Sequence, residues 1–497
     1  MMGPATRPAL RAHADARGPE WSRAVRRALV GRKPLVPREL RGDPGARSYE
    51  VGGPCQNVLI MDGKPRSTEL TAVEICAGAG GQSLGLHLAG FRHALAVELD
   101  RDAAATLDRN LSRLACEEGS QRPVVVVGDV ADESVWLPEH YRGVSLLAGG
   151  VPCPPFSIAG KQLGTSDERD LFAWAVEAAG RMQPDAVLLE NVRGLSMPRF
   201  AGYRQAVLDR FAELGYRADW RLLEAKDFGV PQLRPRFILV ALREEFAPYF
   251  AWPEPTPAAQ TVGSALYDLM AANGWVGAEE WAKRADRVAP TIVGGSKKHG
   301  GPDLGPTRAK RAWRLIGVDG LGIADAAPGP GAPADLVPKL TNEMVARIQG
   351  WAGPGYEWDF GDGHRRKTAT YRQIGNAFPP PVARAVGQAI ASALRKENQS
   401  YDDHGVLSQY RDEVYRVLRE YDGFISLRGL RNAVGGALGD HEIERRIEFL
   451  RRDFDIEVRQ RGSHLTYRLG EWKAFRGQGD HSRHLAFATE RLRSKIS

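Results

Sequence analysis

A short apolar run that stops at two glycines, followed by a cysteine between prolines, constrains this chain more than any other stretch. Residues 144–148 read as a buried parallel strand, which ends at Gly149-Gly150. Pro152 and Pro154 fix their own φ and favour extended backbone at the residue before each. The Cys153 thiol is therefore predicted on a stiff loop at the carboxyl end of a strand, where open α/β sheets bind ligands. This position favours a nucleophile, because a structural cysteine more often lies inside an apolar run.

The composition narrows the class of protein. A chain of 497 residues is long enough for two to four domains. Its formal net charge of +7 favours a polyanionic partner. No apolar stretch approaches the roughly 20 residues that cross a bilayer, so we predict no membrane contact. The four cysteines lack the spacing of a metal site and indicate a reducing compartment; they are Cys55, Cys76, Cys116 and Cys153.

The first 68 residues are rich in Arg, Pro, Ala and Gly and show weak apolar periodicity. This composition predicts a basic, flexible arm, with one basic helix over residues 21–30 and a transit peptide as the alternative interpretation. Cys55 stands in a Gly-Pro-Cys-Gln sequence, but a polar, glycine-rich segment precedes it. With no strand to position its thiol, Cys55 is interpreted as incidental.

A strand, a glycine turn and a helix follow the arm. Residues 71–76 read as the strand, 77–81 contain three glycines, and 83–90 read as a helix that closes on a glycine. This order is that of the first βα unit of a Rossmann-like sheet. Glycines let the backbone approach a ligand, and the helix N-terminus favours a carboxylate or phosphate.

Acidic residues follow the next two predicted strands. The strand over residues 94–97 ends in Glu98-Leu99-Asp100, and the strand over 124–127 ends in Gly128-Asp129-Val130. An acid about 20 residues beyond the glycine turn is where a ribose diol is bound. Asp129 could accept a hydrogen bond from an adenine amino group. Together these residues predict an adenosine cofactor of open identity, with helix capping as the alternative role for Asp100.

A carboxyl group and two guanidinium groups follow the cysteine in the chain. Beyond a predicted helix over residues 172–179, the strand over 186–189 ends in Glu190-Asn191-Val192. Arg234 and Arg236 directly precede another strand, over residues 237–242. If these strands share one sheet, the thiol, the carboxyl group and the guanidinium groups lie at strand ends in the same sheet. A helix cap for Glu190 and a solvated edge for the arginines are the alternatives.

The order of these motifs resembles that of DNA (cytosine-5) methyltransferases, from Thr71 to the helix that ends near Leu394. Two departures are visible. Cys76 replaces an aromatic residue before the glycine turn, and Pro154 replaces the glutamine that usually follows the nucleophile. The matching stretches are residues 74–81, 98, 129, 150–157, 190–192, 232–236, 340–350 and 371–379.

The resemblance implies S-adenosylmethionine as cofactor and a covalent reaction on a cytosine flipped out of the duplex. It assigns Cys153 to attack C6, Glu190 to hold N3 and the exocyclic amine, and Arg236 to contact O2. Arg234 would support the site or a backbone phosphate. The implied catalytic residues are Cys153, Glu190, Arg236, Arg234, Asn191 and Pro152; the implied cofactor-binding residues are Cys76, Ala77, Gly78, Ala79, Gly80, Gly81, Glu98, Leu99, Asp129, Val130 and Asn376.

We therefore predict an α/β fold, with a Rossmann-like methyltransferase sheet, a smaller target-recognition domain and a C-terminal α+β winged-helix-like domain. The winged-helix-like domain is interpreted as an accessory DNA-binding module or as a protein–protein module. Residues 157–170 suit a loop that closes over the flipped base, with Lys161 and Gln162 as candidate contacts. The predicted segments are the arm (1–68), the catalytic domain (69–243), the target-recognition region (244–336), the return segment (337–398), the winged-helix-like domain (402–470) and a basic tail (471–497).

The predicted function is cytosine-5 methylation of DNA in restriction-modification or epigenetic marking. Double-stranded DNA is the expected partner, bound by a monomer in the cytoplasm and nucleoid, and a cognate restriction endonuclease is a candidate partner. An RNA (tRNA) cytosine-5 methyltransferase and a catalytically idle DNA-binding protein are the alternatives. We set aside a nicotinamide oxidoreductase, which leaves the Pro-Cys-Pro loop unexplained. We also set aside amino-methyltransferases, which carry Asn or Asp where this chain has Cys153.

Overall fold

The computed structural model describes residues 69–152, 171–256, 260–294, 302–361, 367–400, 412–462 and 464–472. The predictions for the N-terminal arm, for Cys153 and for the loop at 157–170 fall outside these described residues. So does the predicted basic tail beyond residue 472. Among the described residues, none of the helices combines the length and the apolar character that a bilayer span requires.

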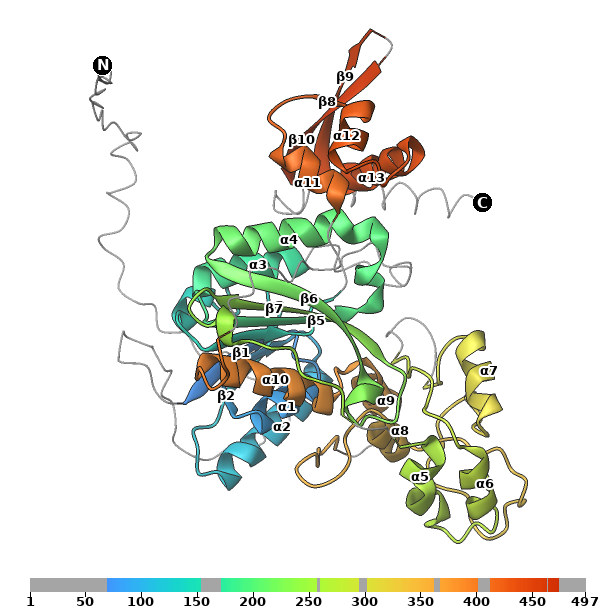
Figure 1. Ribbon diagram of the computed structural model, residues 1–497. Helices are drawn as coiled ribbons and strands as arrows, with labels where there is room; N and C mark the ends of the chain where they lie inside the picture. The colour runs from blue at the N-terminus through green and yellow to red at the C-terminus, as the bar shows by residue number, and fades with distance from the viewer. Residues whose placement is uncertain are drawn as a thin grey trace, which may run out of the picture. The chain divides into compact units, whose positions relative to one another are not determined.

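A seven-stranded sheet forms the centre of the domain predicted as catalytic, in the order β3-β2-β1-β4-β5-β7-β6 (Figure 1). The first five strands of the chain pair in parallel, whereas β7 runs antiparallel between β5 and β6. The strand order reverses between β1 and β4, and ligands of open α/β sheets bind outside the carboxyl ends at such a point. The strands are Leu70–Ile75 (β1), Phe91–Glu98 (β2), Val124–Val127 (β3), Leu146–Gly149 (β4), Ala186–Val192 (β5), Tyr216–Glu224 (β6) and Pro235–Arg243 (β7).

Helices cover both faces of this sheet, because successive strand residues point to opposite sides. Val73 and Leu147 face a core shared with α3 and α4, whereas Ala72 and Ala148 face a core shared with α1 and α10. α2 covers the second face as well, with Leu107 packed on Ala96. These helices are Gly81–Leu88 (α1), Arg101–Glu117 (α2), Leu171–Met182 (α3), Ala201–Glu213 (α4) and Pro380–Leu394 (α10).

Helix α10, in the return segment, packs on α1. Gly85 makes this close approach possible, because a Cβ built there would lie 2.5 Å from the Cβ of Ala383. The two helices thereby connect the return segment to the glycine turn that precedes α1.

Two strand predictions differ from the structure. Glu190, Asn191 and Val192 were expected beyond the end of a strand, but they lie inside β5. The physical reason is β7, whose antiparallel register pairs Glu190 with Ile238 and Val192 with Arg236, so that the ladder continues through all three residues. The edge strand β6 was not predicted at all, and it gives β7 its second hydrogen-bonded neighbour.

A smaller helical region follows the sheet in the chain. Its hydrophobic core contains the buried indoles of Trp281 and Trp313. Residues of the return segment, such as Ile348 and Ile374, belong to the same core. Its helices are Val262–Ala271 (α5), Ala278–Arg284 (α6), Thr307–Leu315 (α7), Asn342–Ile348 (α8) and Lys367–Asn376 (α9); short 3-10 helices elsewhere are Pro138–Tyr141 (η2), Arg193–Ser196 (η4), Pro198–Phe200 (η5), Ala225–Phe228 (η6) and Ala247–Tyr249 (η7).

The C-terminal module (residues 412–472) has the helix, strand, helix, helix, hairpin order expected of a winged helix. The N-cap of its long helix is Gly439, and Asp440 is the first helical residue. The last strand runs to Trp472, two residues into the segment predicted as a tail. The elements are Glu413–Glu420 (α11), Ile425–Ser426 (β8), Leu427–Ala433 (α12), Asp440–Asp453 (α13), Phe454–Arg461 (β9) and His464–Trp472 (β10), with the sheet order β8-β10-β9.

Candidate active site

A cavity of about 320 Å³ opens at the carboxyl ends of the parallel strands. Its lining includes the glycine turn after β1, Glu98 at the end of β2, Pro152 and Glu190. Asn376, the last residue of α9, also lines the wall. Its volume lies in the range of small-molecule sites, about 300–1,000 Å³. Residues predicted separately as cofactor-binding and as catalytic therefore line a single cavity.

The turn between β1 and α1 depends on backbone angles that most residues avoid. Gly78 and Gly80 have φ of 59° and 100°, which glycine adopts without steric cost. Cys76 has φ of 49°, a conformation that is uncommon for a residue with a side chain. A Cβ at Gly78 would meet no atom within 4 Å, so its backbone is open to a ligand.

Glu98 holds this turn to the next strand. Its Oε2 accepts a hydrogen bond of 2.8 Å from the Gly78 N–H, and its Oε1 accepts one of 2.7 Å from the Asp100 N–H. Burial raises the pKa of Glu98, and the two backbone donors oppose this shift. Asp100 accepts hydrogen bonds from the N–H groups of Asp102 and Ala103, which confirms the alternative that it caps a helix.

The indole of Trp358 packs behind the glycine turn. Its Nε1 donates a hydrogen bond of 2.7 Å to the carbonyl oxygen of Ala79, and a Cβ at Gly80 would lie 2.3 Å from a ring carbon of Trp358. Asn110 of α2 fixes the next residue of the segment through two hydrogen bonds of 2.8 Å with the backbone of Asp359. The turn is therefore supported on the side away from the cavity.

Glu190, which lines the cavity, forms a mostly buried ion pair with Arg236. Arg236 Nε lies 2.6 Å from Glu190 Oε1, and the two side chains are 9% and 12% exposed. Because Arg236 pairs with Val192 across the ladder, it is the diagonal neighbour of Glu190 on the same face of the sheet. Burial raises the pKa of Glu190, although Arg236 and Arg234 lower it. Burial thus favours the neutral carboxyl group, and the two guanidinium groups favour the carboxylate.

Arg234 is enclosed by protein and is only 2% exposed. One end of its guanidinium donates to the carbonyl oxygen of Ile292 at 2.7 Å, and the other donates to Gly375 and Ala377 at 2.7 and 3.1 Å. These bonds join the start of β7, the helical region and the end of α9. Of its two predicted roles, this position fits support of the site and does not fit contact with a phosphate.

Asn191 holds the backbone at Val151, two residues before the predicted nucleophile Cys153. It is 2% exposed, and its Nδ2 donates a hydrogen bond of 3.3 Å to the carbonyl oxygen of Val151. Pro152, the next residue, lines the cavity. Cys153 lies outside the described residues, so the position of its sulfur stays a prediction.

A sequence model of the C-5 cytosine-specific DNA methylase family matches residues 70–392. The chain belongs to this family. It is 61% identical over 428 residues to the type II methyltransferase M.NaeI of Lentzea aerocolonigenes, an alignment that covers 86% of this chain and 99% of the relative. It is 47% identical over 337 residues to M.NgoMIV of Neisseria gonorrhoeae, covering 66% of this chain and 100% of the relative. The crystal structure of a Spodoptera frugiperda DNMT2 mutant has 16% identity and a TM-score of 0.42, covering 65% of this chain and 99% of that one.

Within this C-5 methylase, the structure groups most of the predicted residues. Every predicted cofactor-binding residue except Gly80 lines the cavity, together with Pro152 and Glu190. Gly80 instead faces Trp358 and Leu107. The other three predicted residues stand behind the cavity wall. Arg236 pairs with Glu190, Arg234 donates a hydrogen bond to the Gly375 carbonyl oxygen of α9, and Asn191 donates one to the carbonyl oxygen of Val151.

Sequence reasoning gave no role to three further residues around the cavity. Glu74 is fully buried in β1 and pairs with His93 Nε2 at 2.8 Å, while its Oε1 has no hydrogen-bond partner among the described residues. The side-chain amide nitrogen and oxygen of Gln82 also have no hydrogen-bond partner among the described residues. Glu74 and Gln82 both line the cavity. A glutamate inside an apolar strand was the available signal for Glu74. Nothing in the sequence pointed to Trp358, whose partner Ala79 lies 279 residues away.

Proposed function

We propose that this methylase transfers a methyl group from S-adenosylmethionine to C5 of a cytosine flipped out of duplex DNA, through a covalent bond between Cys153 and C6. The observation that carries the proposal is the single cavity that joins the glycine turn to Glu190 and Pro152. A methyl donor bound at the turn and a base held by Glu190 would then meet in one enclosed space.

The residues of the cavity fit an adenosine-containing cofactor with a charged amino-acid end. The open backbone at Gly78 and the N-terminus of α1 suit the polar end of the ligand, and Glu98 and Asp129 stand where a ribose and an adenine would be held. Glu74 Oε1 and the Gln82 amide are buried polar atoms without partners among the described residues, and a bound ligand would satisfy them. Bound S-adenosylmethionine supplies the methyl group.

Each residue of the base site has a part in the proposed reaction. The Cys153 thiolate adds to C6 and forms an S–C6 bond, which moves ring electrons toward C5 and N3. Protonated Glu190 donates a hydrogen bond to N3 and so stabilises the negative charge on the ring, while Arg236 holds the Glu190 side chain from behind the cavity wall. When C5 takes the methyl group, the demethylated cofactor would leave as a neutral thioether. Water then removes the C5 proton, the electrons of that C–H bond re-form the C5–C6 double bond, and the S–C6 bond breaks, which frees the thiolate.

We propose that helix α7 contacts the DNA backbone. Arg308, Arg311 and Arg314 are exposed on this helix, and none of the three has a carboxylate partner among the described residues. Exposed guanidinium groups without carboxylate partners are suited to phosphate oxygens.

We also propose that the protein acts as a monomer, in the cytoplasm and on nucleoid DNA, and that a cognate endonuclease recognises the same sequence.

Bisulfite sequencing of DNA from cells that express the protein tests the reaction and identifies its target. We expect methylated cytosines in one sequence context and none in cells that express Cys153→Ala. Tritiated methyl transfer to purified duplex DNA and to tRNA then separates DNA from RNA as substrate. Transfer to tRNA alone, or equal methylation by Cys153→Ala, would contradict the proposal.

A further inference from the structure

We infer that the C-terminal module acts as an internal brace, which binds helix α4 and holds the turn that follows Glu190, and that it does not read DNA. Its partner is thus the catalytic domain of the same chain. The inference concerns an interface that the methylation chemistry does not use.

The apolar part of this interface lies along one face of α4. Gly202 allows close approach of the module, because a Cβ there would lie 2.1 Å from Leu450 Cδ2 of α13. Tyr203 meets the ring of Trp472 edge-on, with centroids 5.6 Å apart. Ala206 is 4% exposed and belongs to the hydrophobic core of the module itself. A shared core of this kind is typical of a permanent contact.

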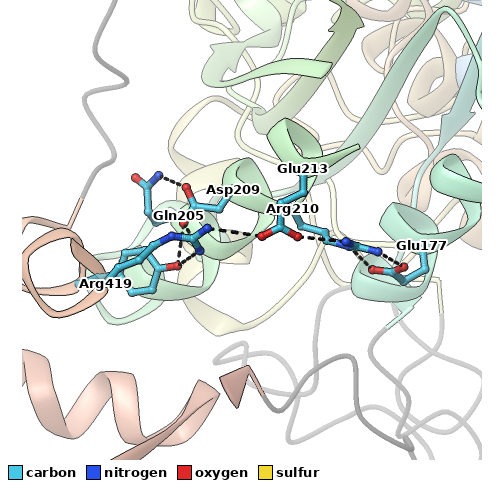
Figure 2. Close-up of polar contacts among 7 residues, drawn as sticks. Glu177, Gln205, Asp209, Arg210, Glu213 and Arg419 are labelled. Carbon is cyan, nitrogen blue, oxygen red and sulfur yellow. Dashed lines mark hydrogen bonds and ion pairs between the residues drawn. The ribbon is translucent and has the colours of Figure 1, made fainter. Parts of the chain in front are cut away.

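The polar part continues on the next turns of α4, as Figure 2 shows. Asp209 accepts a hydrogen bond of 2.7 Å from the hydroxyl of Tyr415, a side chain of α11 that is 1% exposed. Arg419 of α11 lies 2.9 Å from the same carboxylate and 3.4 Å from Glu213. The hydroxyl and the guanidinium of the module thus converge on one half-buried carboxylate of the catalytic domain.

The same network of ion pairs includes α3, the helix that follows the predicted nucleophile loop. Glu213 accepts a hydrogen bond of 3.0 Å from Arg210, whose guanidinium makes two more, of 2.7 and 2.8 Å, to Glu177 of α3 (Figure 2). α3 begins at Leu171, directly after the segment predicted to close over the base. The module is therefore linked to α3 through α4.

A second link joins α4 to the base site. Arg204 is 2% exposed and donates hydrogen bonds to the carbonyl oxygens of Leu195 and Met197, at 2.7 and 2.9 Å. These two residues belong to the turn between β5, which carries Glu190, and α4. Movement of α4 would therefore displace the turn that anchors Glu190 and Asn191.

The charge of the module argues against DNA reading. Its 61 residues contain eleven arginines, no lysine and twelve acidic residues, a net charge of −1. The helix that would enter the major groove in a winged helix is α13. On α13, Glu442 pairs with Arg445 and Arg446, and Leu450 packs on α4. Acidic residues of α13 thus compensate the charge of its arginines, and the catalytic domain covers part of the helix.

The test compares the wild type with Gly202→Leu, which places a side chain where Leu450 docks. Ala212→Leu, on the exposed side of the same helix, is the matched control. A variant truncated after residue 400 and a Tyr415→Phe variant give independent means of weakening the contact. Amide hydrogen exchange without cofactor or DNA measures the brace directly, and it does not depend on methyl transfer.

We expect faster exchange over residues 193–213 in Gly202→Leu and in the truncated chain, and no change in Ala212→Leu. We also expect kcat to fall at least about threefold while KM for DNA and the slope of log Kd against log salt stay unchanged. Unchanged amide exchange over residues 193–213 would overturn the inference that the module holds α4 and the turn after Glu190. A salt slope lower by about 0.9 or more in a chain truncated after residue 400 than in a chain truncated after residue 472 would show lost phosphate contacts and overturn the claim that the module does not read DNA.

Discussion

Trp358 supplies an aromatic contact to the glycine turn from the side opposite the cavity, in a chain that carries Cys76 where relatives are expected to have an aromatic ring. Its hydrogen bond to Ala79 fixes one carbonyl of the turn, and its ring fills the space beside Gly80. Support of the turn thus comes from a residue far along the chain. The ring at this position holds the backbone and does not line the cavity.

Replacing this indole should weaken cofactor binding before it affects the fold. Trp358→Phe removes a hydrogen bond worth about 0.5–1.5 kcal/mol, so we expect affinity for S-adenosylmethionine to fall about two- to tenfold. Isothermal titration calorimetry measures the affinity of each variant for S-adenosylmethionine. The matched control is Trp275→Phe, which removes an indole bond of 2.9 Å to the Pro333 carbonyl away from the cavity. Equal affinities of the two variants would contradict the role of Trp358.

Glu190 should determine how activity falls at high pH. Burial raises its pKa, so the protonated form persists above the ordinary carboxyl range and is lost as pH rises through the raised value. The native state then binds more protons than the unfolded state, and the free energy of unfolding falls over the same interval. We expect Glu190→Gln to lower kcat by about 10²–10⁴ and to remove the alkaline limb of the pH profile. If the Glu190→Gln variant kept the alkaline limb of the pH profile, that limb would come from the titration of another group.

At the scale of elements, helix α7 gives the most direct prediction about DNA. If its three exposed arginines each contact a phosphate, the triple change Arg308→Ala, Arg311→Ala and Arg314→Ala should lower the salt slope of binding by about 2.7, at about 0.9 per contact. Lys283→Ala on α6 is the control, because that ammonium already pairs with Glu280 at 2.8 Å. A slope unchanged by the triple substitution would exclude α7 from the interface.

Element positions were largely predictable from sequence, and strand directions were not. The apolar run at 124–127 matches β3 residue for residue, and the run at 71–76 matches β1 to within one residue at each end. Apolar content carries no information about direction, so neither the antiparallel β7 nor its neighbour β6 could be derived. The direction of β7 explains why Arg236 meets Glu190 along a strand ladder.

At the scale of the whole molecule, the site joins segments from distant parts of the chain. The motif order predicted that the glycine turn, Glu190 and Asn376 would meet, and the cavity brings them together. The contacts that support them could not be predicted, because their partners are backbone carbonyls set by the folded chain. Arg234 shows this most clearly, since it binds the carbonyl oxygens of Ile292, Gly375 and Ala377.

The measurement that tests the central claim most directly is covalent capture on a substrate that cannot release the enzyme. A duplex carrying the sequence found by bisulfite sequencing is prepared with 5-fluorocytosine at the methylated position and incubated with S-adenosylmethionine. Because fluorine blocks loss of the C5 substituent, we predict a denaturation-resistant complex whose cross-linked peptide contains Cys153, and none with Cys153→Ala. No complex with the wild type, or a cross-link at another residue, would contradict the account.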